Sequence, residues 1–456
     1  MVEVLKRSLR HSATARWITM GVVSFTMLCG YYVADVASPI ETLIEEQLHW
    51  NPEQYGLYTS AYGWFNVFLF MLIIGGIILD KKGPRFAGML ASILMVIGCT
   101  LNAWAFRTPS LSEGTILGQN AQVMAAAFGY AIFGMGIEMC GIVATKIIAR
   151  WFKDYEIALA MGLQVAIARI GTGLTFVTSS PIAKAFGHVA APVFGAAILL
   201  GVGLIAYVFY IGMDKKLDAS EGAEERGLTE ESFRLRDIGE ILTNRGFWYI
   251  AILCSLFYSG VFPFLKFATG LMVRKYGVSE SLAGNIPAML PFGTMLLTPV
   301  FGRVYDKKGK GATIMILGSF LILVAHLILS APFLTHWLVA VGAVIVIGFG
   351  FSLVPSAMWP SVPKVIPYRQ LGTAYALIFY IQNLVALMFM PWFVGMVINR
   401  FSTTKVVEAG KDVLHYDYTK PMLIFACCGV LAVIVALMLK GADKKHGYGL
   451  ELPNQK

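Results

Sequence analysis

Long apolar segments alternate with short polar ones along most of the 456-residue chain. A helix needs about 20 apolar residues to cross the roughly 30 Å hydrocarbon layer of a bilayer. Twelve segments meet this requirement and are predicted to be membrane-spanning helices, near residues 16–37, 56–79, 86–106, 120–145, 156–180, 189–212, 247–272, 282–304, 312–332, 337–358, 371–398 and 420–440. The pattern therefore predicts an all-α membrane protein.

The longest polar segment separates the sixth span from the seventh. It divides the chain into two predicted six-helix bundles, residues 16–212 and 247–440, joined by a charged linker at residues 213–246. The linker is expected to contain a short amphipathic helix. Polar tails are predicted at residues 1–15 and 441–456.

Composition supports the membrane interpretation, since 57% of the residues are hydrophobic and 14% are charged. Soluble proteins carry about 25% charged residues. The formal charge of +9 does not indicate a nucleic-acid partner, because the bases gather in short segments between apolar runs. The loop after the first span, SPIETLIEEQLHWNPEQ, has no Lys or Arg. The positive-inside bias then predicts that both termini are cytoplasmic. All six cysteines lie within predicted spans, which indicates buried apolar residues rather than a disulfide framework.

One polar loop sequence occurs twice. GIILDKKGPR (76–85) follows the second span of the first bundle, and GRVYDKKGKG (302–311) follows the second span of the second bundle. Recurrence at one topological position indicates internal duplication. Transporters are commonly built from such repeats, with the substrate site near the membrane midplane between them.

The shared pattern G-x-x-x-D-K-x-G-x-[RK] resembles the loop signature of the major facilitator superfamily. This resemblance implies a twelve-helix transporter fold with two six-helix bundles. It also implies a gating role, weaker in the second copy, for four charged residues: Asp80, Arg85, Asp306 and Lys310. The contact of Asp80 is expected to hold only while the cytoplasmic gate is shut. Alternatively, the charges of these loops merely fix the topology.

Two ionisable residues lie deep within spans. Placing a charged side chain inside the bilayer costs free energy, so such a residue indicates a functional site. Glu138 occurs in YAIFGMGIEMCGIVATK of span four, and Arg169 occurs in LQVAIARIGTGLTF of span five. Because the spans are consecutive, the two are expected to pair across the bundle centre. The pair is either structural or part of a substrate site. Arg suits a carboxylate and Glu suits an ammonium group, so a zwitterion would match both.

Other residues of the spans are candidates for lining the same path. Lys266 is a second cationic candidate, which could instead snorkel toward the outer surface. Uncharged polar side chains could equally join helices to one another. The remaining candidates are Tyr31, Asp35, Tyr62, Asn66, Gln164, Trp359, Gln382 and Asn383.

Longer strings from spans two, four to five, seven, and ten to eleven resemble one branch of the superfamily, the lysosomal dipeptide transporter group named major facilitator superfamily domain-containing protein one. These strings are YGWFNVFLFMLIIGGIILDKKG, GMGIEMCGIVATKIIARWFKDYEIALAMGLQVAIARIGTG, VFPFLKFATGLMVRKYG and MWPSVPKVIPYRQLGTAYALIFYIQNL. The resemblance implies a dipeptide uniporter in which Glu138 and Arg169 meet the termini of the peptide. The chain has no N-x-[ST] sequon and its outer loops are short. A lysosomal setting with a glycosylated partner is therefore not expected, and a monomeric homologue in a bacterial inner membrane fits better.

The sequence thus predicts a transporter of small zwitterions, above all dipeptides or short peptides, working by alternating access. One alternative is a proton-coupled symporter of organic anions or amino acids. A second alternative is a non-transporting membrane sensor. Enzymatic activity, a cofactor and a metal site are not expected, because the sequence has no Walker loop and neither HExxH nor CxxC.

Overall fold

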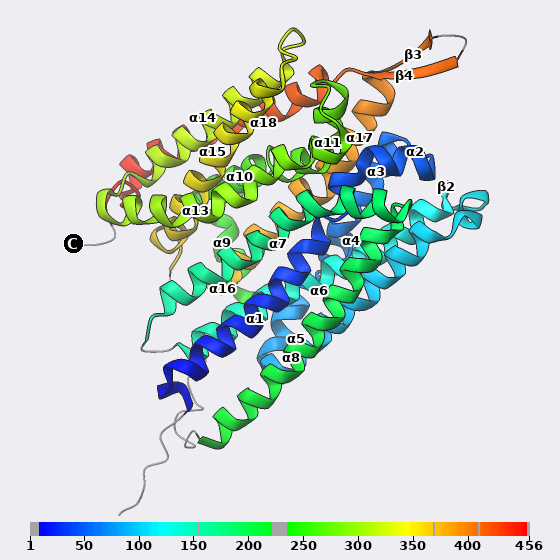
Figure 1. The fold of residues 1–456 in the computed structure, drawn as a ribbon. Coiled ribbons are helices and arrows are strands. Elements are labelled where there is room, and N and C mark those ends of the chain that lie inside the picture. The colour runs from blue at the N-terminus through cyan, green and yellow to red at the C-terminus, as the bar shows by residue number, and fades with distance from the viewer. Residues whose placement is uncertain (1–8, 153–154, 221–234, 368–369, 409–410, 454–456) are drawn as a thin grey trace, which may run out of the picture.

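The computed structural model describes residues 9–152, 155–220, 235–367, 370–408 and 411–453. Nearly all of them are helical and form two bundles (Figure 1). The first half comprises α1 (Ala13–Ala34), α2 (Glu41–Leu48), α3 (Pro52–Ser60), α4 (Trp64–Phe68), α5 (Met71–Arg107), α6 (Ala121–Trp151), α7 (Ile157–Phe186) and α8 (Ala190–Ser220).

The second half follows α9 (Leu235–Thr243), the short helix expected in the linker, part of which lies outside the described residues. Its helices are α10 (Arg245–Ser259), α11 (Phe262–Arg274), α12 (Glu280–Ala283), α13 (Asn285–Lys308), α14 (Gly311–Ser330), α15 (Trp337–Val365), α16 (Leu371–Gln382), a π-helical segment (Asn383–Phe389), α17 (Met390–Phe401) and α18 (Thr419–His446). Two antiparallel hairpins connect helices, β1 (Thr115–Ile116) with β2 (Gln119–Asn120), and β3 (Thr403–Glu408) with β4 (Lys411–Tyr416). Short 3₁₀ turns cover Leu9–His11, Ser38–Ile40, Ala61–Gly63 and Pro109–Glu113.

In the described part of the chain, ten helical segments are long and apolar enough to cross a membrane. The two other predicted spans are present but interrupted or less apolar. Span two runs through α3, α4 and the start of α5, while span eight is α13, which contains two prolines and ends in charged residues. The twelve-helix architecture predicted from the sequence is therefore the one observed.

Breaks within spans follow local backbone chemistry. The end of span two and the start of span three meet at Gly83 (φ 78°), a conformation that glycine adopts readily, and Pro84 follows it. Span two is also broken at Phe70, whose φ of 52° is uncommon for a bulky residue. Span seven is broken between α10 and α11, and span eleven contains the π-helical segment. Such discontinuities mark functional regions in many transporters.

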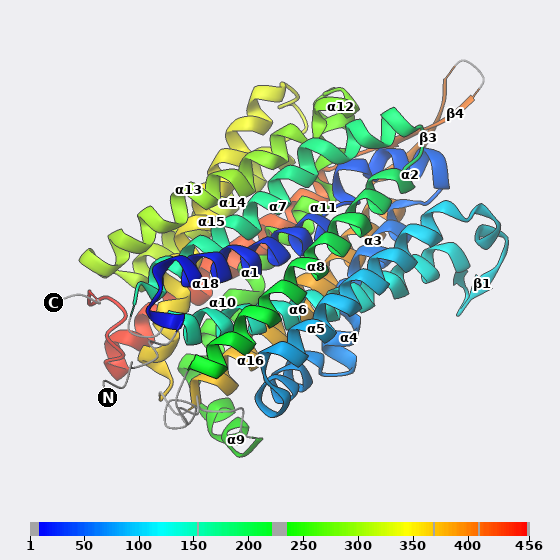
Figure 2. The same ribbon diagram turned by 60° about the horizontal axis from the view of Figure 1, so that its bottom comes forward.

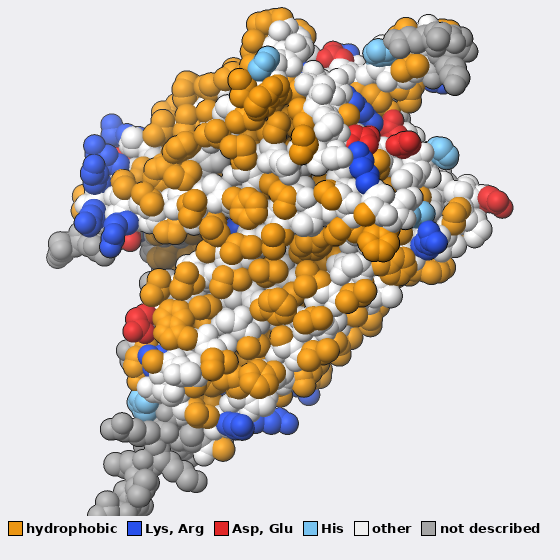
Figure 3. Space-filling model, viewed as in Figure 1, with side chains coloured by type: hydrophobic (Ala, Val, Ile, Leu, Met, Phe, Trp, Pro, Cys, Tyr) orange, Lys and Arg blue, Asp and Glu red, His pale blue; other side chains and the backbone are white. Residues whose placement is uncertain are grey.

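The two halves meet at one end and diverge at the other (Figures 1 and 2). We call the first the sealed end, where α2, α3, α11 and α17 lie, and the second the open end, where α1 begins and α18 ends. At the sealed end α3 packs on α17, α7 packs on α13, and α11 packs against α2. The molecular surface is hollowed between the halves at the open end (Figure 3). A cavity between the bundles is thus reachable from one side.

Glycines allow the close approach of the halves at the sealed end. A Cβ atom on Gly395 of α17 would lie 2.3 Å from the Pro52 carbonyl oxygen and 2.9 Å from the Gly56 Cα atom of α3. A Cβ atom on Gly173 of α7 would lie 2.5 Å from the Phe292 ring of α13. Real Cβ atoms do not come this close. At Gly395 the opposing atoms are backbone, so a larger residue would force the halves apart, whereas at Gly173 the Phe292 ring would have to move.

Candidate functional site

Glu138 of α6 faces the interface between the two halves. The Tyr62 hydroxyl, from the 3₁₀ turn after α3, donates a hydrogen bond to Glu138 Oε1 at 2.9 Å. The carboxylate also interacts with the side chain of Asn383, which begins the π-helical segment of the second half. Asn66 Nδ2 donates to Asn383 Oδ1 at 3.4 Å and to the Gly134 carbonyl at 3.3 Å. A polar network therefore joins span two, span four and span eleven around one carboxylate.

Arg169 of α7 points toward the same interface. Its guanidinium carbon lies 5.7 Å from the ring centroid of Tyr31 and 5.0 Å from that of Phe351. Phe351 belongs to α15, so Arg169 reaches the second half. Both distances suit cation–π attraction. No carboxylate of the described residues lies within 4.0 Å of this guanidinium, which is half-buried.

The expected ion pair between Glu138 and Arg169 is wrong for the described structure, in which the two groups are more than 4.0 Å apart. Each is held by different neighbours: Tyr62 and Asn383 surround the carboxylate, whereas aromatic rings flank the guanidinium. Both groups nevertheless lie at the interface with the second half, Glu138 beside Asn383 and Arg169 beside Phe351. The two charges therefore flank a common region without neutralising each other.

Lys266 of α11 lies on the sealed-end side of the region between Glu138 and Arg169. Its ammonium group donates to Asp35 Oδ1 at 2.7 Å, to the Ala34 carbonyl at 2.7 Å and to the Tyr130 hydroxyl at 3.2 Å. The three partners belong to the first half, and Lys266 is only 9% exposed. The alternative that Lys266 snorkels to the outer surface is therefore wrong. Asp35 and Lys266 form a charged link between the halves.

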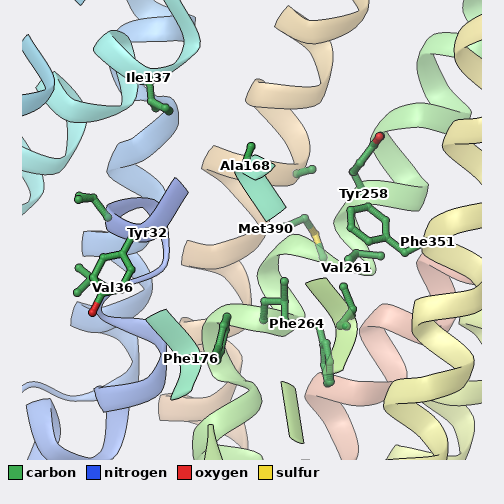
Figure 4. Packing of buried hydrophobic residues seen from close by; sticks show 14 of the residues in the cluster. Tyr32, Val36, Ile137, Ala168, Phe176, Tyr258, Val261, Phe264, Phe351 and Met390 are labelled. Carbon is green, nitrogen blue, oxygen red and sulfur yellow. The ribbon is translucent and has the colours of Figure 1, made fainter. Parts of the chain in front are cut away.

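The second half contributes an aromatic surface. Tyr258 stacks on Phe262 with ring centroids 5.0 Å apart, and Phe351 lies edge-on to Tyr258 at 5.8 Å. Trp359 Nε1 donates to the Tyr258 hydroxyl at 3.4 Å, and its ring stacks on Phe379 at 4.9 Å. Figure 4 shows Tyr258 and Phe351 next to each other on the second half, with Tyr32 across from them on the first. Charges from one half thus oppose aromatic rings from the other.

Two other predicted residues have separate surroundings. Gln382 accepts a hydrogen bond from the Cys254 thiol at 3.6 Å, within the second half, and both side chains are buried. Gln164 is 7% exposed on α7, one turn and a residue before Arg169. Gln382 is therefore a contact between helices of one bundle, as the alternative interpretation of these amides expected.

The charged residues of the first repeated loop contact their own half. Asp80 Oδ1 pairs with Lys146 Nζ at 2.7 Å, and Arg85 Nε pairs with Asp214 Oδ2 at 2.6 Å and contacts Asp218 as well. These contacts exist while the open end is open. The Asp80–Lys146 pair therefore does not meet the expectation of a contact that holds only in the shut state. A gating role for Asp80 and Arg85 stays a prediction.

The second repeated loop is bound by the end of the chain. The Lys310 N–H donates to the Glu451 carbonyl at 3.0 Å, and the Gly311 N–H donates to the Leu450 carbonyl at 2.9 Å. Asp306 is half-buried and the Lys310 side chain is exposed. Their gating role likewise stays a prediction.

Sequence reasoning missed most charged contacts of the sealed end. Arg400 of α17 makes a bidentate pair with Glu53 at 2.6 and 2.9 Å. Arg274 of α11 contacts Glu45 of α2, and Lys184 of α7 pairs with Glu280 of α12 at 3.3 Å. One signal was present: the acidic loop after span one has no bases, while an arginine lies two residues after each of spans seven and eleven. Tyr130 and Phe351 had no such signal, because they occur inside apolar runs.

The sequence was compared with family models and known proteins. The model described as Major Facilitator Superfamily matches residues 21–391. The chain belongs to the Major Facilitator Superfamily. Among relatives in this superfamily, it is similar to the lysosomal dipeptide transporter MFSD1 of Homo sapiens, with 27% identity over 381 residues, covering 81% of this chain and 77% of the relative. The similar protein of Danio rerio is 24% identical over 430 residues, covering 92% and 86%. The resemblance stated from the sequence is thereby confirmed.

Solved structures of major facilitator proteins share the fold. The nucleoside transporter NupG, in a mutant form, has a TM-score of 0.68 at 14% identity, covering 93% of this chain and 99% of that one. A partially occluded inward-open form of the xylose transporter XylE from E. coli has a TM-score of 0.67 at 16% identity, covering 93% and 98%. Identity this low supports the fold alone.

Proposed function

We propose that this protein is a uniporter that moves small zwitterionic solutes, above all dipeptides, across the membrane by alternating access. The observation that carries the proposal is the arrangement of Glu138 and Arg169. Both side chains reach toward the second half, and neither neutralises the other. A zwitterionic dipeptide carries an ammonium group at one end and a carboxylate at the other.

The chemistry of the two residues suits the two ends of a dipeptide. A guanidinium offers two parallel N–H bonds to a carboxylate. A carboxylate that already accepts a bond from Tyr62 has remaining lone pairs for an ammonium group. The aromatic surface around Tyr258 and Phe351 then faces the peptide side chains. Similarity to proteins named as dipeptide transporters supports the same substrate class.

We infer the orientation from the bases that flank the spans. Most of them lie at the open end, so the positive-inside bias assigns this end and both termini to the cytoplasm. The structure then corresponds to an inward-facing state. The chain has no glycosylation sequon, which favours a bacterial inner membrane, whereas the named relatives are lysosomal.

The test is uptake of labelled dipeptide into proteoliposomes by Glu138→Gln and Arg169→Gln. Hydrogen bonds to charged groups contribute about 1.5–3 kcal/mol, so each change is expected to weaken apparent affinity about 10- to 100-fold. Dipeptides with one blocked terminus show which residue binds the amino end and which binds the carboxyl end. Glu138→Gln should no longer distinguish a free from an N-acetylated dipeptide, and Arg169→Gln should no longer distinguish a free from a C-amidated one. Glu113→Gln, on the exposed turn Pro109–Glu113 outside the cavity, is the control. Unchanged uptake in both site variants would refute the site.

A proton-coupled symporter is the second candidate. It is favoured by Glu138, which has no basic partner within 4.0 Å among the described residues and can therefore hold a proton. An inward pH gradient would then drive accumulation above equilibrium, whereas a uniporter only equilibrates. Ligand binding without any flux would instead support the sensor alternative.

A further inference from the structure

The tripeptide Asp-Lys-Lys occurs four times, at residues 80–82, 214–216, 306–308 and 443–445. All four copies lie at the open end, in α5, α8, α13 and α18. Their aspartates make contacts within the protein. Asp80 pairs with Lys146, Asp214 is 1% exposed beside Arg85, and Asp443 accepts the Leu450 N–H at 3.0 Å. The aspartates of the first two motifs are therefore paired with bases of the same half, and Asp443 is bound by a backbone N–H.

The lysines of the four motifs, unlike the aspartates, point to the surface. All eight are exposed, and none has an ion-pair partner among the residues that the structure describes: Lys81, Lys82, Lys215, Lys216, Lys307, Lys308, Lys444 and Lys445. Each copy thus leaves two uncompensated positive charges where a spanning helix ends. Figure 3 shows Lys and Arg side chains gathered at the open end of the second half.

The copy in α13 differs because it adjoins a groove of about 490 Å³. The groove is lined by Pro299, Val300, Arg303, Val304, Lys307 and Lys308. This spacing places the six side chains along one face of the helix. Pro299 and Val300 lie toward the middle of the span, Lys307 and Lys308 lie at its open end, and Arg303 and Val304 lie between them.

The groove continues the face of α13 that meets α7 at the sealed end. There, the Phe292 ring contacts Gly173 of α7. Toward the open end the halves part, and Val300 becomes 55% exposed. Leu159 and Leu163 of α7 are exposed in the same half of their helix, at 54% and 38%. Apolar side chains of both helices are thus exposed toward the open end, and those of α13 lie beside its cationic residues.

We propose that this groove binds an anionic phospholipid of the leaflet at the open end, the cytoplasmic leaflet in the orientation proposed above. The phosphate lies against Arg303, Lys307 and Lys308, and an acyl chain lies along Val300 and Val304. Charge complementarity supports the headgroup position. The order of apolar and cationic residues matches a lipid whose headgroup is at the boundary and whose chain points to the midplane. A free phosphate ion or an acidic protein would not use the apolar part.

Occupancy of the groove has a conformational consequence. The same face of α13 packs on α7 where the halves are closed. Closing the open end by the same packing would require α7 to displace the lipid. The lipid therefore favours the state in which this end is open, as any ligand favours the state that it binds.

The test is native mass spectrometry of the purified full chain with phosphatidylglycerol or phosphatidylcholine. Each base near an anionic headgroup contributes about fivefold in affinity. Lys307→Gln/Lys308→Gln should therefore lower phosphatidylglycerol binding at least tenfold, while Lys307→Arg/Lys308→Arg retains it. The matched control is Lys81→Gln/Lys82→Gln, which removes the same charges from the first repeated loop and should change binding less than twofold.

A second variant keeps the charges and fills the groove. Val300→Trp should remove the tightly bound lipid if its chain lies there. Equal losses in the two lysine pairs, full binding by Val300→Trp, or equal retention of both lipids would each overturn the proposal. The measurement uses no transported substrate, so its outcome is independent of the dipeptide assignment.

Discussion

The sealed and open ends of this transporter have similar kinds of charged residues but join them differently. At the sealed end, four ion pairs between described residues connect one half to the other: Asp35–Lys266, Glu45–Arg274, Glu53–Arg400 and Lys184–Glu280. At the open end, the pairs of Asp80 and Arg85 stay within the first half. Whether an end is closed or open thus depends on whether its ion pairs join the two halves or stay within one half. The number of charged residues at that end does not decide it.

The contributions at the sealed end are unequal. An exposed pair such as Glu53–Arg400 stabilises little by itself. A buried link such as Asp35–Lys266 is costly to break on one side only, because it leaves a charge without its partner. The close packing of α3 on α17 adds a steric requirement: the contact needs glycine at positions 56 and 395, whatever the charged pairs contribute. Each of these differences can be tested separately.

The largest effect is expected from Asp35→Asn. Loss of one buried partner costs about 3–5 kcal/mol; we expect about 3 kcal/mol, because Lys266 keeps its bonds to the Ala34 carbonyl and Tyr130. The sealed end should open. Distances between spin labels at Glu46 and Leu282, on opposite halves, would report this in a pulsed electron resonance measurement.

The double variant Asp35→Asn/Lys266→Met is the control for that experiment. Removing both charges avoids the unpaired ammonium group, so its distance distribution should lie closer to that of the unmodified protein. If the double variant opens the sealed end more than the single one, the pair is not a charged latch.

Asp214→Asn tests the open end. Asp214 is buried and holds Arg85, Arg150 and Trp151. Hydrogen bonds to charged groups contribute about 1.5–3 kcal/mol, so we expect a loss of about 2 kcal/mol in stability and a lower Tm. The spin-label distance at the sealed end should stay unchanged, because these contacts join helices of one half. A changed distance would contradict the division between the two ends.

Gly395→Ala tests packing without changing charge. The added Cβ would meet the Pro52 carbonyl and Gly56, both of which are backbone. Overpacking typically costs about 1–3 kcal/mol, and here that cost applies only to the sealed state. We therefore expect partial opening in the same distance measurement. Gly348→Ala of α15 is the matched control, since its Cβ would have no atom within 4 Å.

The smallest effect is expected from titrating Glu53. Its bidentate contact with Arg400 lowers the pKa of the Glu53 carboxyl below the ordinary value. A lowered pKa contributes stability that is complete above the ordinary glutamate pKa of about 4.3 and is lost as the pH falls through the lowered value. The sealed end should therefore loosen slightly in acid. Arg400→Gln should remove this pH dependence without altering Asp35–Lys266.

The sequence was sufficient for the architecture because membrane thickness sets helix length. The apolar runs predicted the spans, and the polar loop at residues 76–85 separates spans two and three. The repeated loop and the longer strings gave the family. The break at Phe70 was not predictable, since nothing in an apolar run marks a left-handed aromatic residue.

The candidate site was predictable in its residues but not in its contacts. Glu138 and Arg169 stood out because charge is rare inside spans. Their separation could not be foreseen, because it depends on Tyr62 and Phe351, residues distant in sequence that direct each side chain elsewhere. The link between Asp35 and Lys266 joins residues of different halves, and such pairing is set by tertiary packing rather than by local pattern.

The break at Phe70 divides span two into two helical pieces that can move relative to each other. Its outer piece is held by the packing of α3 on α17 and of α4 on α6 and the π-helical segment. Its inner piece, α5, begins a new series of backbone hydrogen bonds at Met71. The inner piece can therefore change its tilt without breaking the contacts that hold the outer piece. One crossing of the bilayer can thus serve as a fixed anchor at one side and a moving lever at the other.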